Sequence, residues 1–139
     1  MYYLKTEGTF DSAHFLANYD GKCKNLHGHQ WRVVAEIQGL NLHENGSKKG
    51  MVVDFSDIKK ALKQLCDNFD HSLIYESNSM KQATIEALKS ENFRIIEVPF
   101  RPTAENFAKY FYDELAKSGF SMKKVEVYET PTNCAIYEG

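Results

Sequence analysis

His27 and His29 are separated by one residue, and two imidazoles at this spacing could form part of a metal site. In a β-strand, residues two apart point to the same face, so both imidazoles could bind one metal ion. His14 is the best candidate for a third ligand, because it ends an earlier extended segment that we expect to pair with this strand. Three neutral imidazoles without a fourth protein ligand are typical of an open zinc site, which water or substrate completes. The alternative is that these are ordinary histidines on a sheet.

A cysteine, Cys23, lies four residues before this pair, and Lys22 and Lys24 flank it. Positive charge near a thiol favours the thiolate, which could act as a general base or a nucleophile. An ordinary loop cysteine explains the same sequence equally well. Cys66 falls on the apolar face of a predicted helix and Cys134 falls in a late strand, so we expect both to be packing residues.

Two carboxylates also stand where catalysis or binding could use them. Asp70 directly precedes His71, and an aspartate beside an imidazole orients the ring and stabilises its protonated form. Alternatively, Asp70 only caps the next segment. Glu129 shares its alternation with Val125 and Val127, and an inward carboxylate needs a buried cation or a ligand with N–H donors. If the strand has already ended, Glu129 is simply solvated.

The elements that position these residues follow from the hydrophobic pattern. Residues 2–10 look extended, and residues 27–38 form the clearest strand, with alternate apolar side chains. Apolar residues at three- and four-residue spacing predict a helix with Ser56 as its N-cap, and another over 104–117 with Thr103 as its N-cap. A shorter helix and three further strands are predicted over 80–89, 93–98, 124–129 and 134–137. Strands before and after the helices predict an α+β fold, an antiparallel sheet with helices on one side.

Composition and charge exclude several classes of function. The 17 basic and 19 acidic residues are spread along the chain without a basic block, so nucleic acid is not an expected partner. No apolar run approaches the roughly 20 residues of a membrane span, and the first residues do not resemble a signal peptide. Three cysteines cannot all pair, which indicates reduced thiols in the cytoplasm. The length and the lack of a linker predict one domain over 1–139.

Six motifs, in order and over nearly the whole chain, resemble the 6-pyruvoyl-tetrahydropterin synthase family. They are Phe10-Asp11-Ser12-Ala13-His14, Cys23-x-x-x-His27-Gly28-His29, Met51-Val52-Val53-Asp54-Phe55, Asp70-His71, Pro102-Thr103-Ala104-Glu105-Asn106 and Tyr128-Glu129-Thr130-Pro131-Thr132. The resemblance implies the T-fold (tunnelling fold), an antiparallel four-stranded sheet with two main helices on one face. It also implies that trimers close a barrel and that two trimers stack into a homohexamer, with active sites between subunits. The segment 77–96 is longer than in compact members of the family.

The same resemblance implies roles for the candidate residues. Zn2+ would be bound by three histidines, His14, His27 and His29. The proton-transfer group would be Cys23, Asp70 and His71, and the last two could act in the site of a neighbouring chain. Glu129 would anchor a pterin through the N–H groups of its ring.

Two reactions compete within the family. One eliminates triphosphate from 7,8-dihydroneopterin triphosphate and isomerises the side chain to give 6-pyruvoyl-tetrahydropterin. The other, in the queuosine pathway, takes the same substrate and loses acetaldehyde and triphosphate to give 6-carboxy-5,6,7,8-tetrahydropterin. The segments Val53-Asp54-Phe55 and Tyr128-Glu129-Thr130-Pro131-Thr132 look more like bacterial queuosine-pathway members, which favours the second reaction. The alternative from another class is a zinc-stabilised pterin-binding module without catalysis.

Overall fold

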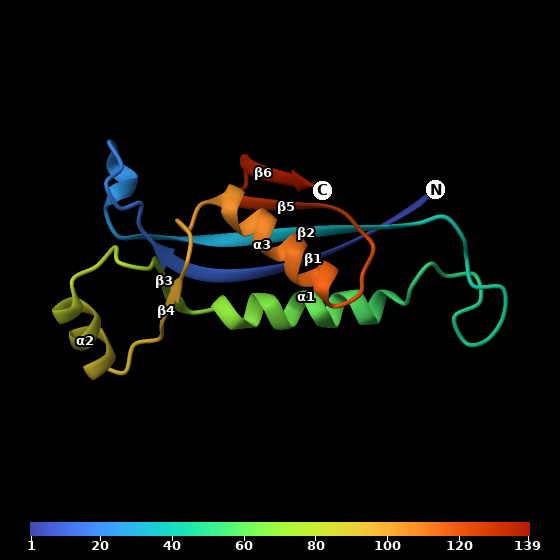
Figure 1. Ribbon diagram of the computed structural model, residues 1–139, viewed down its shortest axis with the longest axis horizontal. Helices are drawn as coiled ribbons and strands as arrows, with labels where there is room; N and C mark the ends of the chain where they lie inside the picture. Colours follow the sequence, from blue (N-terminus) through green and yellow to red (C-terminus); the bar gives the residue numbers. More distant parts are fainter.

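The computed structural model describes residues 1–139 (Figure 1). Its strands are β1 (Tyr2–His14), β2 (His27–Gly39), β3 (Ser72–Glu76), β4 (Ile95–Val98), β5 (Met122–Thr130) and β6 (Asn133–Glu138). Its helices are α1 (Phe55–Phe69), α2 (Gln82–Ser90) and α3 (Ala104–Lys117), with a short 3-10 turn, η1 (Lys22–Lys24). No helix is long and apolar enough to cross a membrane.

All six strands form one sheet in the order β4-β3-β1-β2-β5-β6. The β1–β2, β2–β5 and β5–β6 pairs are antiparallel, whereas β3 runs parallel to β1 and β4 runs parallel to β3. The α+β class is therefore confirmed, but the expectation of a four-stranded, wholly antiparallel sheet is wrong. The reason is that the chain leaving α1 adds β3 beside the last residues of β1, where Ser12 and Ala13 pair with Ser72 and Leu73.

Helices α1 and α3 pack against one face of the sheet, and α2 lies apart from them, at the end of the sheet near β3 and β4 (Figure 1). The core between sheet and helices consists of inward residues of the long strands and the apolar stripes of α1 and α3. Its largest fully buried side chains include Phe10, Trp31, Ile37, Ile58, Leu62, Phe107 and Phe111. Burying each such side chain stabilises the fold by about 1.5–3 kcal/mol, so the sheet that carries the histidines is rigidly supported.

The helix caps agree with the sequence at α3 and differ at α1. Thr103 caps α3, where its hydroxyl accepts a hydrogen bond from the backbone N–H of Asn106 at 3.2 Å. The N-cap of α1 is Asp54, so the expectation of Ser56 is wrong. A carboxylate oxygen of Asp54 accepts both the backbone N–H and the hydroxyl of Ser56, at 2.9 and 2.8 Å, and thereby satisfies a free N–H of the first turn.

Candidate metal centre and active site

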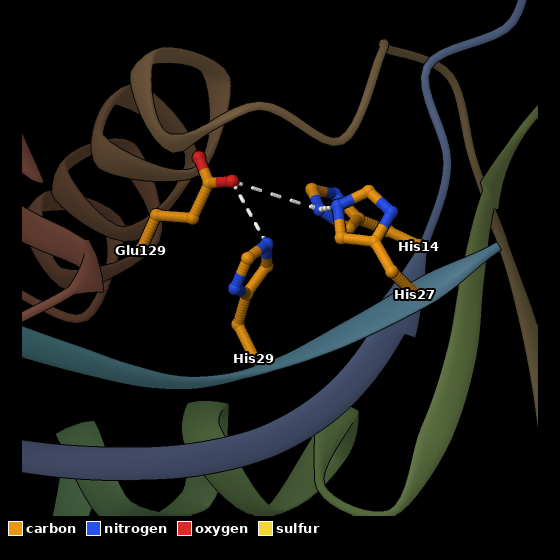
Figure 2. Close-up of side chains that lie close together, drawn as sticks. All are labelled: His14, His27, His29 and Glu129. Carbon is orange, nitrogen blue, oxygen red and sulfur yellow. Dashed lines mark hydrogen bonds and ion pairs between the residues drawn. The ribbon is translucent and has the colours of Figure 1, made fainter. Parts of the chain in front are cut away.

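The pairing of β1 with β2 brings the three histidines together. His14 lies directly opposite His27, and Ser12 lies opposite His29, so His29 is a diagonal neighbour of His14. The ring centroids of His14 lie 4.5 Å from those of His27 and 5.0 Å from those of His29, and the last two lie 4.9 Å apart. Figure 2 shows the three rings turned toward one another beside Glu129.

The indole of Trp31 is fully buried and packs against two of the three imidazoles. It meets the rings of His14 and His29 edge-on, with centroids at 5.0 and 5.5 Å, and packs in turn against Phe107 at 5.0 Å. Aromatic rings in such edge-to-face contact restrict one another's orientation. The hydrophobic core therefore holds two of the imidazoles in place and keeps water from their inner side.

Backbone carbonyls fix which ring nitrogen carries the proton. Nδ1 of His14 lies 2.7 Å from the carbonyl oxygen of Pro102, and Nδ1 of His27 lies 2.6 Å from that of Asn25. A carbonyl only accepts, so each Nδ1 donates, and Nε2 of each neutral ring is bare. The two Nε2 atoms lie 3.0 Å apart, close to the separation of about 3.3 Å between two nitrogens on one tetrahedral zinc ion. Such second-layer carbonyls orient the histidine ligands of metals.

Burial favours the neutral form of His14 and of His29. It lowers the pKa of His14 to about 4, with smaller contributions from His27 and His29, against the opposing effect of the Pro102 carbonyl. Burial also lowers the pKa of His29, although Glu129 opposes it. Nε2 of His29 is buried and lies 2.9 Å from a carboxylate oxygen of Glu129. The cluster thus presents bare nitrogens and a carboxylate without a cation, which fits a divalent metal ion such as zinc.

Glu129 reaches the cluster from a β-bulge near the end of β5. Tyr128 pairs with Cys134 and Thr130 pairs with Asn133, which leaves Glu129 as the extra residue between them. Bulges of this kind redirect a side chain. Oε1 of Glu129 lies 2.9 Å from Nε2 of His29 and 3.9 Å from Nε2 of His14 (Figure 2). Its donor atom and those of the three histidines all lie within 4.8 Å of one another.

Cys23 does not belong to this group of four. It lies in η1, partly buried, within the loop that joins His14 to His27. Two hydrogen bonds hold that loop in place. The backbone N–H of Leu16 donates to the carbonyl of Cys23 at 2.9 Å, and the guanidinium of Arg101 donates to the carbonyl of Ala17 at 2.8 Å. The thiol is therefore carried by a folded loop at the end of β1 and β2 where the histidines lie.

Asp70 and His71 form a separate pair, also outside that group. Nδ1 of His71 lies 2.8 Å from Oδ2 of Asp70, and Oδ1 of Asp70 accepts the backbone N–H of Asp11 at 2.8 Å. The hydrogen bond from Asp11 is the main cause that lowers the pKa of Asp70, and the hydrogen bond to Asp70 raises the pKa of His71. The side chain of His71 is 79% exposed, so this oriented imidazole faces solvent rather than the cluster of its own chain.

The backbone carbonyls that orient the histidine rings were not predicted from the sequence. The carbonyls of Asn25 and Pro102 set the tautomers of His27 and His14, and any residue type can supply a carbonyl. No residue pattern could therefore have indicated them. In the sequence Trp31 follows His29 at the same two-residue spacing. Only the structure shows that its ring packs against those of His14 and His29.

Comparison with known proteins identifies the family. The chain matches the family described as 6-pyruvoyl tetrahydropterin synthase over residues 3–139. A Haemophilus influenzae protein named 6-carboxy-5,6,7,8-tetrahydropterin synthase is 38% identical, over 99% of both chains. The chain belongs to the 6-pyruvoyl tetrahydropterin synthase family. The expected membership of this family of lyases is thereby confirmed.

Further relatives and solved structures agree with this assignment. A Synechocystis protein named 6-carboxy-5,6,7,8-tetrahydropterin synthase is 32% identical over 99% of this chain and 93% of its own. The crystal structure of 6-pyruvoyl tetrahydropterin synthase from Plasmodium vivax matches 99% of this chain and 97% of its own, with TM-score 0.72 and 19% identity. The Caenorhabditis elegans enzyme of the same name covers 99% and 95%, with TM-score 0.68 and 26% identity. The T-fold is therefore confirmed.

Proposed function

We propose that this protein converts 7,8-dihydroneopterin triphosphate to 6-carboxy-5,6,7,8-tetrahydropterin, with loss of acetaldehyde and triphosphate. It acts as a zinc-dependent enzyme of queuosine precursor biosynthesis in the cytoplasm. The observation that carries the proposal is the pair of bare Nε2 atoms of His14 and His27, 3.0 Å apart beside His29. The names of the Haemophilus and Synechocystis relatives support the choice of product.

The side chains divide the work as follows. Three histidines, His14, His27 and His29, hold Zn2+, which when bound supplies a Lewis acid toward the hydroxyl oxygens of the substrate. The carboxylate of Glu129 accepts hydrogen bonds from two N–H groups of the pterin ring and holds it in register. The thiolate of Cys23 removes a carbon-bound proton, and His71, oriented by Asp70, moves protons to and from oxygen. Triphosphate leaves by elimination, and a retro-aldol-type step that consumes one water molecule then breaks the carbon–carbon bond. The carbon next to the ring becomes the carboxylate, and the other two side-chain carbons leave as acetaldehyde.

The proposal includes assembly of the single 1–139 domain into a homohexamer, a dimer of trimers. Asp70 and His71 are exposed and lie outside the histidine cluster of their own chain, although proton transfer needs them within reach of the substrate. Placing the active site between subunits lets the pair of one chain complete the site of its neighbour.

Two alternatives have specific support. The structures from Plasmodium vivax and Caenorhabditis elegans are named 6-pyruvoyl tetrahydropterin synthase, which favours simple triphosphate elimination. The second alternative is a zinc-stabilised pterin-binding module. Glu129 lies 2.9 Å from Nε2 of His29 and could be a fourth protein ligand, as in closed structural zinc sites.

A product assay separates these functions. The zinc-loaded protein is incubated with 7,8-dihydroneopterin triphosphate, the pterins are identified by mass spectrometry, and acetaldehyde is assayed in the same sample. We expect 6-carboxy-5,6,7,8-tetrahydropterin with acetaldehyde in equal amounts. 6-Pyruvoyl-tetrahydropterin without acetaldehyde would favour the first alternative, and unchanged substrate would favour the second.

A further inference from the structure

Arg94 lies between α2 and β4, in the segment 77–96, and its guanidinium reaches the end of α1. Nη1 donates to the carbonyl oxygen of Asp70 at 2.5 Å. Nη2 donates to the carbonyl oxygens of Asn68 and Asp67, at 2.6 and 3.1 Å. One side chain thus binds three carbonyls around the helix terminus, a task for which the rigid fork of guanidinium donors is suited.

Arg94 completes the hydrogen bonding of the α1 terminus. A helix leaves its last four carbonyls without partners inside the helix. Here the carbonyl of Cys66 accepts the N–H of Asp70, and the carbonyl of Phe69 accepts the hydroxyl of Ser72. Arg94 satisfies the remaining two. Its positive charge also lies at the negative end of the helix dipole, which is the favourable arrangement.

The same contacts hold the backbone of the Asp70–His71 pair from both sides. Asp70 is the C-cap of α1, and its carbonyl is bound by Arg94 while its carboxylate is bound by Asp11. His71 follows with a left-handed φ of 55°, a conformation that is costly for a residue other than glycine unless its surroundings enforce it. The backbone N–H of Leu73 then donates to the carbonyl oxygen of Arg94 at 3.0 Å.

We propose that Arg94 is a positioning residue for the Asp70–His71 pair, which it fixes through the carbonyl of Asp70 and the terminus of α1. This inference rests on the proposed function only in that the pair is taken to transfer protons. Arg94 makes no hydrogen bond to the His71 ring, so it acts through Asp70. The segment 77–96, which carries α2 and Arg94 at the end of the sheet near β3 and β4 (Figure 1), would then support the catalytic geometry.

Removing Arg94 has two opposite effects on the pKa of His71, and their sum tests the proposal. The charged groups around His71 are Asp70, Asp11 and Arg94, and the charge of Arg94 by itself lowers the pKa of His71 while Asp70 raises it. Loss of that charge alone therefore raises the pKa of His71. Loss of the Asp70–His71 geometry lowers the pKa toward the ordinary value of about 6.5.

The test compares Arg94→Met, Arg94→Lys and the control Lys89→Met in the full chain. Lys89 belongs to the same segment, is exposed, and its side chain makes no hydrogen bond or ion pair. The pKa of His71 is measured by NMR of the imidazole without substrate, and kcat and KM are measured with 7,8-dihydroneopterin triphosphate. We expect the pKa of His71 to fall in Arg94→Met, and kcat to fall roughly 10- to 100-fold, as misplaced catalytic groups cause, with little change in KM. Arg94→Lys should show smaller changes, and Lys89→Met none.

Each other outcome is also decisive. A His71 pKa that rises or stays constant would overturn the proposal, whatever happens to kcat. A fall in pKa with normal turnover would support the positioning role and refute proton transfer by the pair. If Arg94→Met does not fold, Arg94→Lys carries the test. In the His71→Asn background, Arg94→Lys should cause no further loss of kcat, whereas a role in folding alone would give the same loss in both backgrounds.

Discussion

The Nε2 atoms of His14 and His27 face each other at 3.0 Å, although both nitrogens are bare when the rings are neutral. Two lone pairs at this distance repel each other unless a proton or a cation lies between them. The low pKa of His14, which results mainly from burial, argues against a proton at neutral pH. A divalent cation removes the repulsion, and this makes the arrangement a prepared ligand set rather than a pair of packed side chains.

We expect Glu129 to be needed for substrate binding but not for metal binding. Glu129→Gln keeps the shape of the side chain but loses the charge that we expect to face the pterin N–H groups. Losing a hydrogen bond to a charged group costs about 1.5–3 kcal/mol, so kcat/KM should fall roughly 10- to 100-fold while the zinc content stays unchanged. Metal analysis of the purified variant together with steady-state kinetics provides the check. A protein without zinc would show instead that Glu129 is a metal ligand.

Cys23 should be needed for turnover but not for zinc. The thiol lies outside the group of four donor residues, so Cys23→Ala should keep its metal and its thermal stability. We expect its kcat to fall at least roughly 100-fold, within the range for loss of a general base. Cys134→Ala is the matched control: the expectation that Cys134 is a packing residue is wrong, since its thiol is exposed, and it has no proposed role. Full activity of Cys23→Ala with zinc bound would refute the proposed proton transfer.

The Asp70–His71 pair predicts a pH-dependent contribution to stability. Because the folded protein raises the pKa of His71, its contribution is complete below the unfolded value of about 6.5 and is lost as the pH rises through the folded pKa. Because the pKa of Asp70 is lowered, its contribution is present above the unfolded value and is lost as the pH falls through the folded pKa. The difference in Tm between wild type and His71→Asn should therefore be largest near pH 5–6 and shrink above.

Asparagine is the appropriate replacement at position 71, since it tolerates the left-handed backbone of that residue. His43→Ala serves as the control, because the side chain of His43 is exposed and makes no hydrogen bond. A Tm difference that stays constant from pH 5 to pH 9 would show that the His71–Asp70 hydrogen bond contributes nothing measurable to stability.

The strand β2 and the helix α3 could be predicted because each is long and strongly periodic. The alternation of β2 also predicted that His27 and His29 point to the same face of the sheet. The strand β3 could not be predicted. It has five residues, only two residues separate it from the end of α1, and it pairs with β1 through only two pairs of residues. Such a short strand is specified by tertiary contacts rather than by its own pattern.

The candidate residues could be named from the sequence, but their arrangement could not. The alternation along β5 predicted that Glu129 points inward. In the structure a β-bulge directs this side chain toward the histidines. Bulges have no reliable sequence signal, so this contact could not be predicted. The role of Arg94 could not be predicted from the sequence, because its partners are backbone carbonyls. These contacts depend on how α1, β3 and β4 meet.

The most direct test of the account is a zinc titration of the metal-free protein. Calorimetry on wild type, His27→Ala and the control His43→Ala would give the stoichiometry and the affinity. We expect one zinc ion per chain for wild type and His43→Ala, and for His27→Ala an affinity lower by at least roughly 100-fold, since one of three imidazole ligands is missing. Equal zinc affinity in wild type and His27→Ala, or no binding to wild type, would contradict the claim that His14, His27 and His29 form the metal centre.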